Sequence, residues 1–376
     1  MEIMNLEDCC EILDSMRIPI TESDREEGKY PYYGANGIQD YVADYIFDDE
    51  LVLLAEDGGN FGSKEKPIAY RVSGKCWVNN HAHVLKPKAS LNVDYLCYSL
   101  MFYKVEGMIN GATRQKLTQA AMRKMKIPLR SMKEQVYIVE QLNYINQIKT
   151  QRQRELKLLE NLIIARFVEM FGDPDNNEKG FIKAPMGDYM TLLTDFSSNG
   201  SYKTLDSGVT MYDEPNYAWM VRTTDLESGD MTAIKYIDED AYELLAKSKI
   251  YGGEIIMNKI GSAGKVYLMP QIDMPASLGR NAFMFRYDER INVKYLYRLL
   301  TSEYGQREIQ QYVRGAVTKT ITKKDVRAVH IIVPPIELQN EFESFAEQVD
   351  KSKDSVQKAL DEAQLLFDSL MQQYFG

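Results

Sequence analysis

The stretch from Glu134 to Gly172 decides the fold, and it reads EQVYIVEQLNYINQIKTQRQRELKLLENLIIARFVEMFG. It contains no proline, and its only glycine is its last residue. Its apolar residues recur at alternating steps of three and four, which is the spacing of one face of an α-helix. About 37 helical residues at roughly 1.5 Å each form a rod about 55 Å long. One small core cannot bury such a rod, which therefore needs a partner helix.

The partner is the last stretch of the chain, Leu338 to Gly376, which reads LQNEFESFAEQVDKSKDSVQKALDEAQLLFDSLMQQYFG. Its apolar residues follow the same spacing, and Gln135 and Gln339 lie 204 positions apart, as do Phe171 and Phe375. Two unrelated solvated helices would not share such an offset, so we predict that the two helices pack together. We expect these residues at the interface: Leu142, Ile145, Leu156, Leu159, Ile163, Phe345, Val349, Val356, Ala363 and Leu366.

The charges of the two helices differ in sign. The middle of the first carries Lys149, Arg152, Arg154 and Lys157, whereas the second carries Glu341, Glu343, Glu347, Asp350, Asp354, Asp361 and Glu362. Opposite charges beside apolar seams favour pairing of the two helices with each other over self-pairing.

Composition limits the class of protein. A chain of 376 residues should hold two or more domains, and 44% hydrophobic with 11% aromatic residues is typical of globular cores. There is no apolar run of transmembrane length, and the acidic N-terminus is unlike a signal peptide, so we expect a cytoplasmic protein with no membrane partner. The four cysteines lack CxxC spacing, which indicates neither a zinc site nor a disulfide framework. A net charge of −10 argues against an indiscriminate polyanion binder but leaves room for a local basic face.

The region before each long helix is repeated as well. Asn281-Ala282 corresponds to His81-Ala82 at an offset of 200, and Gly315-Ala316 corresponds to Gly111-Ala112 at 204. A four-residue insertion between these points accounts for the change. We therefore predict an α+β protein with two pseudo-repeated α/β globular domains, 1–132 and 181–336, each followed by a long helix, 133–172 and 337–376, with a Gly- and Pro-containing linker at 173–180.

Motifs for catalysis or metal binding are weak. The segment Gly261-Ser-Ala-Gly-Lys265 has Lys259 and Val266 where a phosphate-binding P-loop needs glycine and Ser or Thr. His81 and His83 could be metal ligands on a strand, but there is no third histidine nearby and no cysteine pair, so a packing role is favoured. No catalytic spacing of carboxylates or nucleophiles stands out. The chain is predicted to be a binding protein without an enzymatic activity, a metal or a cofactor of its own.

Several short stretches, in the same order in both halves, resemble the specificity subunit of type I restriction–modification enzymes. They are Pro31–Gly37 (PYYGANG), Leu53–Gly58 (LLAEDG), Gly261–Val266 (GSAGKV), the Gly-Ala loops at Gly111 and Gly315, and the Pro-containing segments that lead into Glu134-Gln135 and Gln339. The family motif at the last position is Pro-Leu-Pro-Pro-Leu-x-Glu-Gln. This chain departs from it with Arg130 and Ser131 in place of the prolines and with Leu338 in place of the glutamate.

The resemblance covers essentially the whole chain and implies a non-catalytic subunit. Such a subunit has two target-recognition domains whose long helices pair antiparallel, and it selects a bipartite double-stranded DNA sequence with one half-site per domain and the helices fixing the gap. It recruits two modification subunits, which carry S-adenosylmethionine and methylate adenine, and through them restriction subunits that need ATP and Mg.

Two polar loops in equivalent places are the first candidates for DNA contact. A DNA reader needs cationic, amide or hydroxyl side chains on loops that reach base edges and phosphates. The loop residues are Thr113, Arg114, Gln115 and Lys116 in the first half and Thr318, Lys319 and Thr320 in the second. A second candidate group comprises Lys259, Ser262 and Lys265 on a glycine-rich turn, with Asn60, Lys64 and Lys66 in roughly the corresponding place of the first half.

A coiled-coil scaffold whose two domains bind proteins is the alternative. The paired helices fit both interpretations. The placement of basic and amide side chains distinguishes them, because a protein scaffold has no need to place such groups twice at equivalent positions. An ordinary solvated turn is the alternative interpretation for any single loop residue.

Overall fold

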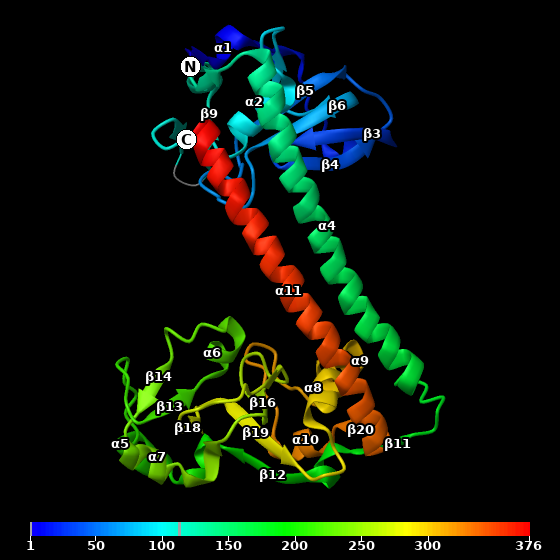
Figure 1. Cartoon of the computed structure of the whole chain (residues 1–376), viewed down its shortest axis with the longest axis vertical. Helices are drawn as coiled ribbons and strands as arrows, with labels where there is room; N and C mark the ends of the chain where they lie inside the picture. The colour runs from blue at the N-terminus through cyan, green and yellow to red at the C-terminus, as the bar shows by residue number, and fades with distance from the viewer. Residues whose placement is uncertain (1, 112–113) are drawn as a thin grey trace. The chain divides into compact units, whose positions relative to one another are not determined.

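The computed structural model describes residues 2–111 and 114–376. The chain divides into two compact units (Figure 1). The first comprises Met1–Leu156 with Ser355–Gly376, and the second comprises Lys157–Asp354. Each unit contains one globular domain and a part of both long helices, so the two units are described separately.

The first domain is built on a six-stranded sheet with strand order β2-β7-β5-β6-β3-β4. Its strands are β2 (Cys10–Ile12), β3 (Glu27–Gly34), β4 (Gly37–Val42), β5 (Phe47–Ala55), β6 (Ala69–Val78) and β7 (Ala82–Pro87). In β5, Val52 and Leu54 join the core that contains α2 (Val93–Met101), whereas Leu51 and Leu53 join a second core on the other face. Burial on both faces explains why this strand is continuously apolar.

Short elements complete the first domain. The N-terminal strand β1 (Glu2–Asn5) pairs antiparallel with β10 (Lys126–Leu129), the strand that leads into the first long helix. Between α2 and β10 lie β8 (Ile109–Asn110), β9 (Lys116–Leu117) and α3 (Gln119–Arg123). Helix α1 (Leu6–Cys9) follows β1.

The second domain repeats this plan and adds a second sheet. One four-stranded sheet has the order β12-β19-β16-β17, and the other has the order β14-β13-β18-β15. The strands are β12 (Met190–Asp195), β13 (Ala218–Val221), β14 (Lys235–Ile237), β15 (Lys249–Ile250), β16 (Ile255–Asn258), β17 (Val266–Leu268), β18 (Ala276–Leu278) and β19 (Ala282–Tyr287). As in the first domain, the first strand, β11 (Ile182–Pro185), pairs antiparallel with the last, β20 (His330–Val333). The helices are α5 (Tyr202–Gly208), α6 (Thr223–Ser228), α7 (Glu239–Leu244), α8 (Val293–Thr301), α9 (Glu303–Gln310) and α10 (Lys323–Ala328).

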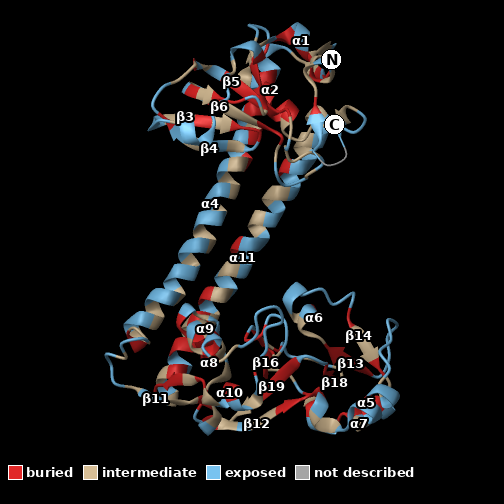
Figure 2. Ribbon diagram, turned by 180° about the vertical axis from the view of Figure 1, so that it is seen from behind, coloured by how far each residue is buried: buried red, intermediate tan, exposed pale blue. Residues whose placement is uncertain are grey.

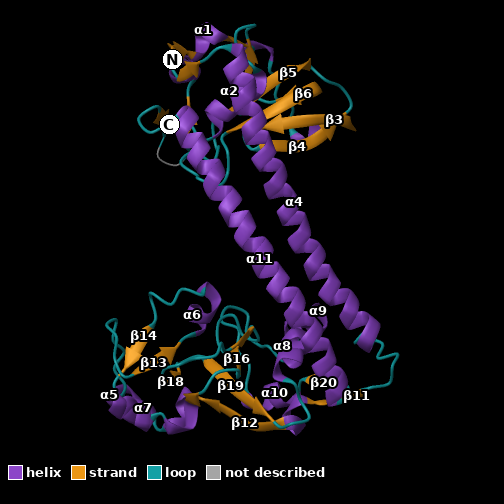
Figure 3. Ribbon diagram, viewed as in Figure 1, coloured by secondary structure: helices purple, strands orange, loops and turns teal. Residues whose placement is uncertain are grey.

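The two long helices have equal length. Helix α4 (Met132–Phe171) and helix α11 (Ile336–Phe375) each contain 40 residues, and each begins and ends one residue before the bounds expected from the sequence (Figure 3). At the start of α4, Ser131 and Glu134 bond each other's side chains and backbone in a capping box. Gly172, with a φ of +73°, ends the helix in the left-handed conformation that favours glycine.

In each unit the two long helices pair antiparallel through apolar side chains. In the first, Leu142 and Ile145 of α4 share a core with Phe367 of α11. In the second, the rings of Phe167 and Phe171 lie 5.5 Å from the ring of Phe342, centroid to centroid. Ion pairs from Arg166 to Glu341 (2.8 Å) and from Lys353 to Glu160 (3.5 Å) fix the antiparallel direction. The predicted fold class is thereby confirmed. Buried residues gather in the globular domains and near the two ends of α4, whereas residues 146–170 of α4 are half-buried or exposed (Figure 2).

The predicted interface residues differ in how deeply they are buried. Leu142, Ile145, Val349 and Val356 are buried, and Leu156, Leu159, Ile163, Phe345 and Ala363 are half-buried. Leu366 is 52% exposed and its neighbour Phe367 only 3%, so the prediction for Leu366 is corrected. The next turn of the interface is reached by a step of four from Ala363, whereas the sequence analysis counted a step of three.

The charged residues of α4 do not all pair with α11. Arg152 bonds Glu155 of its own helix at 2.7 Å, and the Lys149 ammonium lies 4.5 Å from the ring centre of Phe367. Apolar packing therefore contributes more to the pairing than the charge pattern does, because exposed ion pairs stabilise little. Among the described residues, no helix is long and apolar enough to cross a membrane.

A buried glutamine fixes the start of each long helix to its domain. Gln135 accepts a hydrogen bond from Asn92 N (2.7 Å) and donates to the carbonyls of Ser90 and Arg130 (both 2.9 Å). The amide of Gln339 makes the same three bonds, to Asn292 N (2.9 Å) and to the carbonyls of Arg290 (3.0 Å) and Pro334 (2.8 Å).

We predict that Phe367→Ala lowers the free energy of unfolding of the first unit by about 3–5 kcal/mol, since it leaves a cavity in a packed core. The matched change Leu366→Ala should stay within about 0.5 kcal/mol because that side chain is exposed. Urea denaturation of both variants measures the difference. Equal effects would contradict the assigned interface.

We also predict that Gln339→Ala destabilises the second unit by about 1–3 kcal/mol, because one buried donor and two buried acceptors lose their partner. The control is Gln348→Ala, an exposed position of the same helix. Thermal and urea unfolding of both variants would reveal the difference, and a neutral Gln339→Ala would show that water replaces the amide at no cost.

Candidate nucleic-acid interface

Each domain carries a tight loop that begins at a glycine with positive φ. In the second domain, Arg314 and Thr320 exchange both backbone hydrogen bonds, at 2.9 and 2.7 Å. Gly315 has a φ of +108°, and a Cβ there would lie 2.2 Å from the carbonyl oxygen of Thr318. Gly111 has a φ of +96°, and its Cβ would lie 2.4 Å from the carbonyl oxygen of Arg114. Only glycine fits such a turn. We call residues 110–111 with 114–117 the Gly111 loop and residues 314–321 the Gly315 loop.

Each loop is tied to the turn that follows the central strand of its sheet. Gly58 N donates to the carbonyl of Gln115 (3.3 Å), and Gly261 N donates to the carbonyl of Lys319 (2.9 Å). On the other side of the turn, Leu117 N bonds Glu56 O (2.7 Å), and Ile321 N bonds Lys259 O (3.0 Å). Two segments are therefore hydrogen-bonded to each other in each domain. In the first domain they are the Gly111 loop and residues 56–60, which we call the Gly58 turn. In the second they are the Gly315 loop and residues 259–265, which we call the Gly261 turn.

Most of the predicted loop residues are exposed. Arg114, Gln115, Lys116, Thr318, Lys319 and Thr320 all reach the surface, whereas Thr113 lies outside the described residues. Arg114 pairs with Asp57 (2.7 Å) and Lys116 with Glu56 (3.0 Å), with 60% and 48% of the two cationic side chains exposed. Their carboxylate partners are largely covered, with 15% of the Asp57 and 12% of the Glu56 side chain exposed, so each cation faces solvent from the rim of a buried carboxylate.

Lys259 is an internal ion-pair partner. Its ammonium lies 2.9 Å from the buried carboxylate of Asp195, and the lysine side chain is 19% exposed. The ion pair with Asp195 competes with a phosphate for this ammonium, and a DNA contact by Lys259 stays a prediction.

Other predicted residues line hollows. Ser262, Lys265 and Lys319 line one hollow of about 760 Å³ in the second domain, together with Glu227, which pairs with Lys265 at 2.5 Å. The structure therefore brings together three of the residues predicted for this half.

Of the remaining candidates of the first half, Asn60 is the last residue of the Gly58 turn, whereas Lys64 and Lys66 follow that turn in the chain. Lys64 lines a second hollow of about 710 Å³ between the end of α2 and the end of α11, among Tyr98, Phe102, Met371 and Phe375. Asn60 and Lys66 lie on either side of Lys64 in the chain. Asn60 is half-buried, and Lys66 is exposed.

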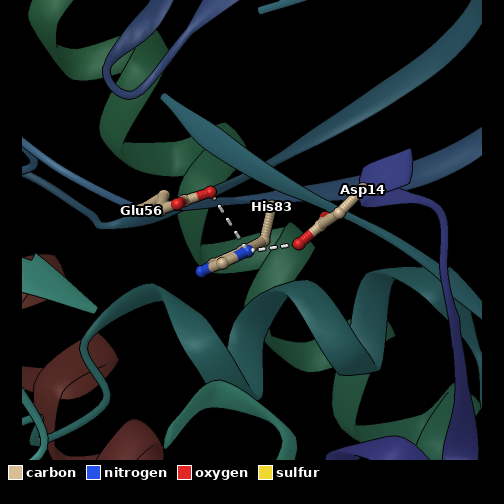
Figure 4. Close-up of side chains that lie close together, drawn as sticks. All are labelled: Asp14, Glu56 and His83. Carbon is tan, nitrogen blue, oxygen red and sulfur yellow. Dashed lines mark hydrogen bonds and ion pairs between the residues drawn. The ribbon is translucent and has the colours of Figure 1, made fainter. Parts of the chain in front are cut away.

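A buried carboxylate lies beneath the loop in the first domain. Asp14 accepts hydrogen bonds from Val84 N (2.9 Å) and from the Gln119 amide (2.9 Å), and its Oδ2 lies 2.6 Å from Nδ1 of His83 (Figure 4). The other nitrogen of His83 lies 2.9 Å from the carbonyl oxygen of Leu117. Burial alone would raise the pKa of Asp14, but the hydrogen bonds from its partners outweigh this, and the pKa is lowered.

The equivalent carboxylate in the second domain is Asp195. It is bonded by Lys259 (2.9 Å), Lys323 (2.8 Å), Ser197 (2.8 Å) and Ser198 (2.6 Å). Burial would raise the pKa of Asp195, but these hydrogen bonds, chiefly those from Lys323, Ser198 and Lys259, hold it well below its usual range.

Asp14, Glu56 and His83 lie close enough together to suggest a metal site. Their oxygen atoms are already used, however: Glu56 bonds both Arg17 (2.6 Å) and Lys116 (3.0 Å). A divalent cation would have to displace two resident cations, so the cluster is better described as an internal ion network.

The sequence analysis missed Asp14, Asp195, Gln119 and Lys323. Asp14 and Asp195 lie 181 positions apart, away from the 200 to 204 offset that revealed the repeat, because 86 positions separate Asp195 from Asn281 whereas only 67 separate Asp14 from His81. Their usable signal was local: each lies at the end of a short strand, with Asp14 two positions after β2 and Asp195 as the last residue of β12.

Two α/β domains that each precede one of two paired long helices, and that each carry the same loop and turn, define the class of protein. The sequence pattern of the family described as "Type I restriction modification DNA specificity domain" matches residues 1–158 and 189–364. The chain therefore belongs to this family, which is that of the specificity subunit and is not catalytic.

Relatives and solved structures agree. The chain is 21% identical to the Type I restriction enzyme MjaVIII specificity subunit of Methanocaldococcus jannaschii, over 95% of this chain and 89% of that protein. A specificity subunit of Haemophilus influenzae is 36% identical, over 39% of this chain and 37% of the relative. The crystal structure of the S subunit from M. genitalium has a TM-score of 0.60 at 13% identity and covers all of this chain and 96% of its own. At that identity the structural likeness shows the fold alone.

Asp195→Asn should lower the free energy of unfolding at pH 7 by about 2 kcal/mol. A carboxylate whose folded pKa is depressed contributes stability that is present above its ordinary value of 3.8 and is lost as the pH falls below that value. The difference between wild type and variant should therefore shrink in acid. Urea titrations from pH 7 to pH 3 measure it, with the exposed Asp273→Asn as control. A difference that stays constant with pH would show that the carboxylate is not held ionised by its partners.

Proposed function

We propose that this chain is the DNA sequence-recognition subunit of a type I restriction–modification complex and reads a bipartite double-stranded target. The Gly111 loop with the Gly58 turn reads one half-site, and the Gly315 loop with the Gly261 turn reads the other. The observation that carries the proposal is that the same two-segment surface is built twice, with exposed cationic, amide or hydroxyl side chains each time.

The chain alone binds DNA weakly in this proposal. Its net charge is −10, and several loop cations are shared with Asp57, Glu56 and Glu227. Since phosphate contacts supply most of the affinity of DNA-binding proteins, tight binding needs partner subunits that close around the duplex. Nanomolar, sequence-specific binding by the purified chain at physiological salt would contradict this.

Two modification subunits, which hold S-adenosylmethionine, are the proposed partners, with restriction subunits that use ATP and Mg. Helix α4 offers a surface for such a partner within the second unit, because Leu158, Leu162, Ile164 and Val168 are 45–61% exposed there. Apolar residues repeated along an exposed helix mark protein contacts. The long helices set the separation of the half-sites in this proposal, and its target, cellular DNA, leads us to expect a cytoplasmic location.

A scaffold that only binds proteins is the competing function. The exposed apolar residues of α4 fit it equally well. The duplicated polar loops and membership of a DNA specificity family favour DNA recognition.

The test is methylome sequencing of cells that carry this chain with its modification subunits. We expect methylated adenines in a single bipartite sequence that is absent without this chain. Methylation that does not depend on the chain, or that lacks a sequence preference, would leave the scaffold as the better interpretation.

Exchange of one loop residue should affect one half-site only. We predict that Arg114→Ala relaxes or weakens recognition of the first half-site and Lys319→Ala that of the second. Loss of a bidentate base contact costs about 1–3 kcal/mol at one position, whereas loss of a phosphate contact weakens all sequences and lowers the salt slope by about one. Methylation profiling and DNA-binding measurements at several salt concentrations distinguish the loss of a base contact from the loss of a phosphate contact.

Lys247→Ala provides the matched control for Lys319→Ala, since Lys247 is an exposed lysine of the same domain outside the loop and the turn. If both loop variants behave like this control, the loops are ordinary solvated turns and the site assignment fails.

A further inference from the structure

In each domain one buried carboxylate occupies the same place in the fold. Asp195 is the last residue of β12 and pairs across the sheet with Phe283 of β19. Asp14 follows β2, whose neighbour across the sheet is β7, and it accepts a hydrogen bond from Val84 N. Their exposed fractions are 4% for Asp195 and 7% for Asp14, so a bound duplex could not touch either one.

In the second domain this carboxylate holds both segments of the candidate surface at once. Lys259, which begins the Gly261 turn, bonds one oxygen of Asp195, and Lys323 bonds the other. Lys323 is the first residue of α10 and follows the Gly315 loop after a single intervening residue. The Gly261 turn, through Lys259, and the Gly315 loop, through Lys323, are thus both connected to the Asp195 carboxylate at the end of β12.

In the first domain, Asp14 is likewise connected to both the Gly111 loop and the Gly58 turn, but through different side chains. Gln119, the first residue of α3, follows the Gly111 loop as Lys323 follows the Gly315 loop, and its amide bonds Asp14. His83 connects Asp14 to the last carbonyl of that loop, at Leu117. On the turn side, Glu56 is held by Arg17, whose guanidinium also lies 3.6 Å from Asp14.

We propose that Asp14 and Asp195 are positioning residues for half-site recognition: each sets the loop and the turn of its own domain at the spacing that DNA reading requires, without touching DNA. The inference rests on the proposed function of the two domains. Two ionic networks that differ in chemistry but converge on the same two segments support it, since stability alone could come from any buried pair. Reading base edges demands placement within a fraction of an ångström, which rigid support of the loops provides.

The tested protein is the full chain assembled with its modification subunits, and the variants are Asp14→Asn and Asp195→Asn, which keep the side-chain shape. The substrate is a DNA library with the bases of one half-site randomised at a time. We expect Asp195→Asn to lower methylation of the correct second half-site at least tenfold and to relax its sequence, with the first half-site unchanged. Asp14→Asn should do the reverse.

Two controls are built into the chain. Lys323→Gln gives the second domain the residue that the first has at the same place, Gln119, so it should retain most of the second half-site recognition. Asp273→Asn removes an exposed carboxylate of the same domain and should change neither half-site.

A merely stabilising role gives a different pattern. If Asp195→Asn lowers the melting temperature and reduces methylation without altering the base preference of the second half-site, the inference is overturned. The inference is also overturned if Asp195→Asn shows wild-type base selectivity when methylation is measured well below its melting temperature. A wild-type complex without any bipartite target overturns the proposed function and this inference together, whereas a bipartite wild type with unchanged variants overturns the inference alone.

Discussion

Each long helix depends on one buried amide at its start. A glutamine side chain has two N–H donors and an acceptor oxygen, and Gln135 and Gln339 each use both donors and the oxygen on the backbone of their own domain. A helix of 40 residues turns a small angular error at its start into a large displacement at its end. Three hydrogen bonds from a fully buried side chain leave little freedom in that angle, so the direction of the helix is fixed where it leaves the domain.

The sequence predicted the architecture well because its signals are periodic and repeated. The offset between Gln135 and Gln339 identified two positions that prove to make the same three bonds. The error at Leu366 arose because steps of three and four are both compatible with one helical face. Only the facing core, which holds Phe367, decides between them.

The candidate surface could be predicted only in part. Gly111 and Gly315 stood out because the turn they make tolerates no Cβ, which is a local property visible in a sequence. The role of Lys259 did not, because whether an ammonium faces solvent or a buried carboxylate depends on Asp195, a residue 64 positions away that no repeat offset marked. Charge type can be read from a sequence, whereas its partner is a property of the fold.

The two halves keep the same geometry while exchanging neutral groups for charged ones. Beside the first helix, Tyr98 bonds Asn143 (2.6 Å) and Asn146 (3.0 Å). At the corresponding place, Arg298 bonds Glu343 (2.7 Å) and Asp350 (2.6 Å).

The ion pair of Arg298 with the buried Glu343 in the second domain carries a desolvation cost that the neutral hydrogen bonds of Tyr98 in the first domain avoid. Burial raises the pKa of Glu343 despite Arg298, and one of its carboxylate oxygens has no hydrogen-bond partner. The exchange of Gln119 for Lys323 beneath the loops follows the same pattern. The repeat therefore preserves a polar contact between each domain and its long helix, although the partner can shift: Asp350 corresponds to Asn146, whereas Glu343 corresponds to Val139. The chemistry of that contact can differ, provided that every buried charge meets an opposite one.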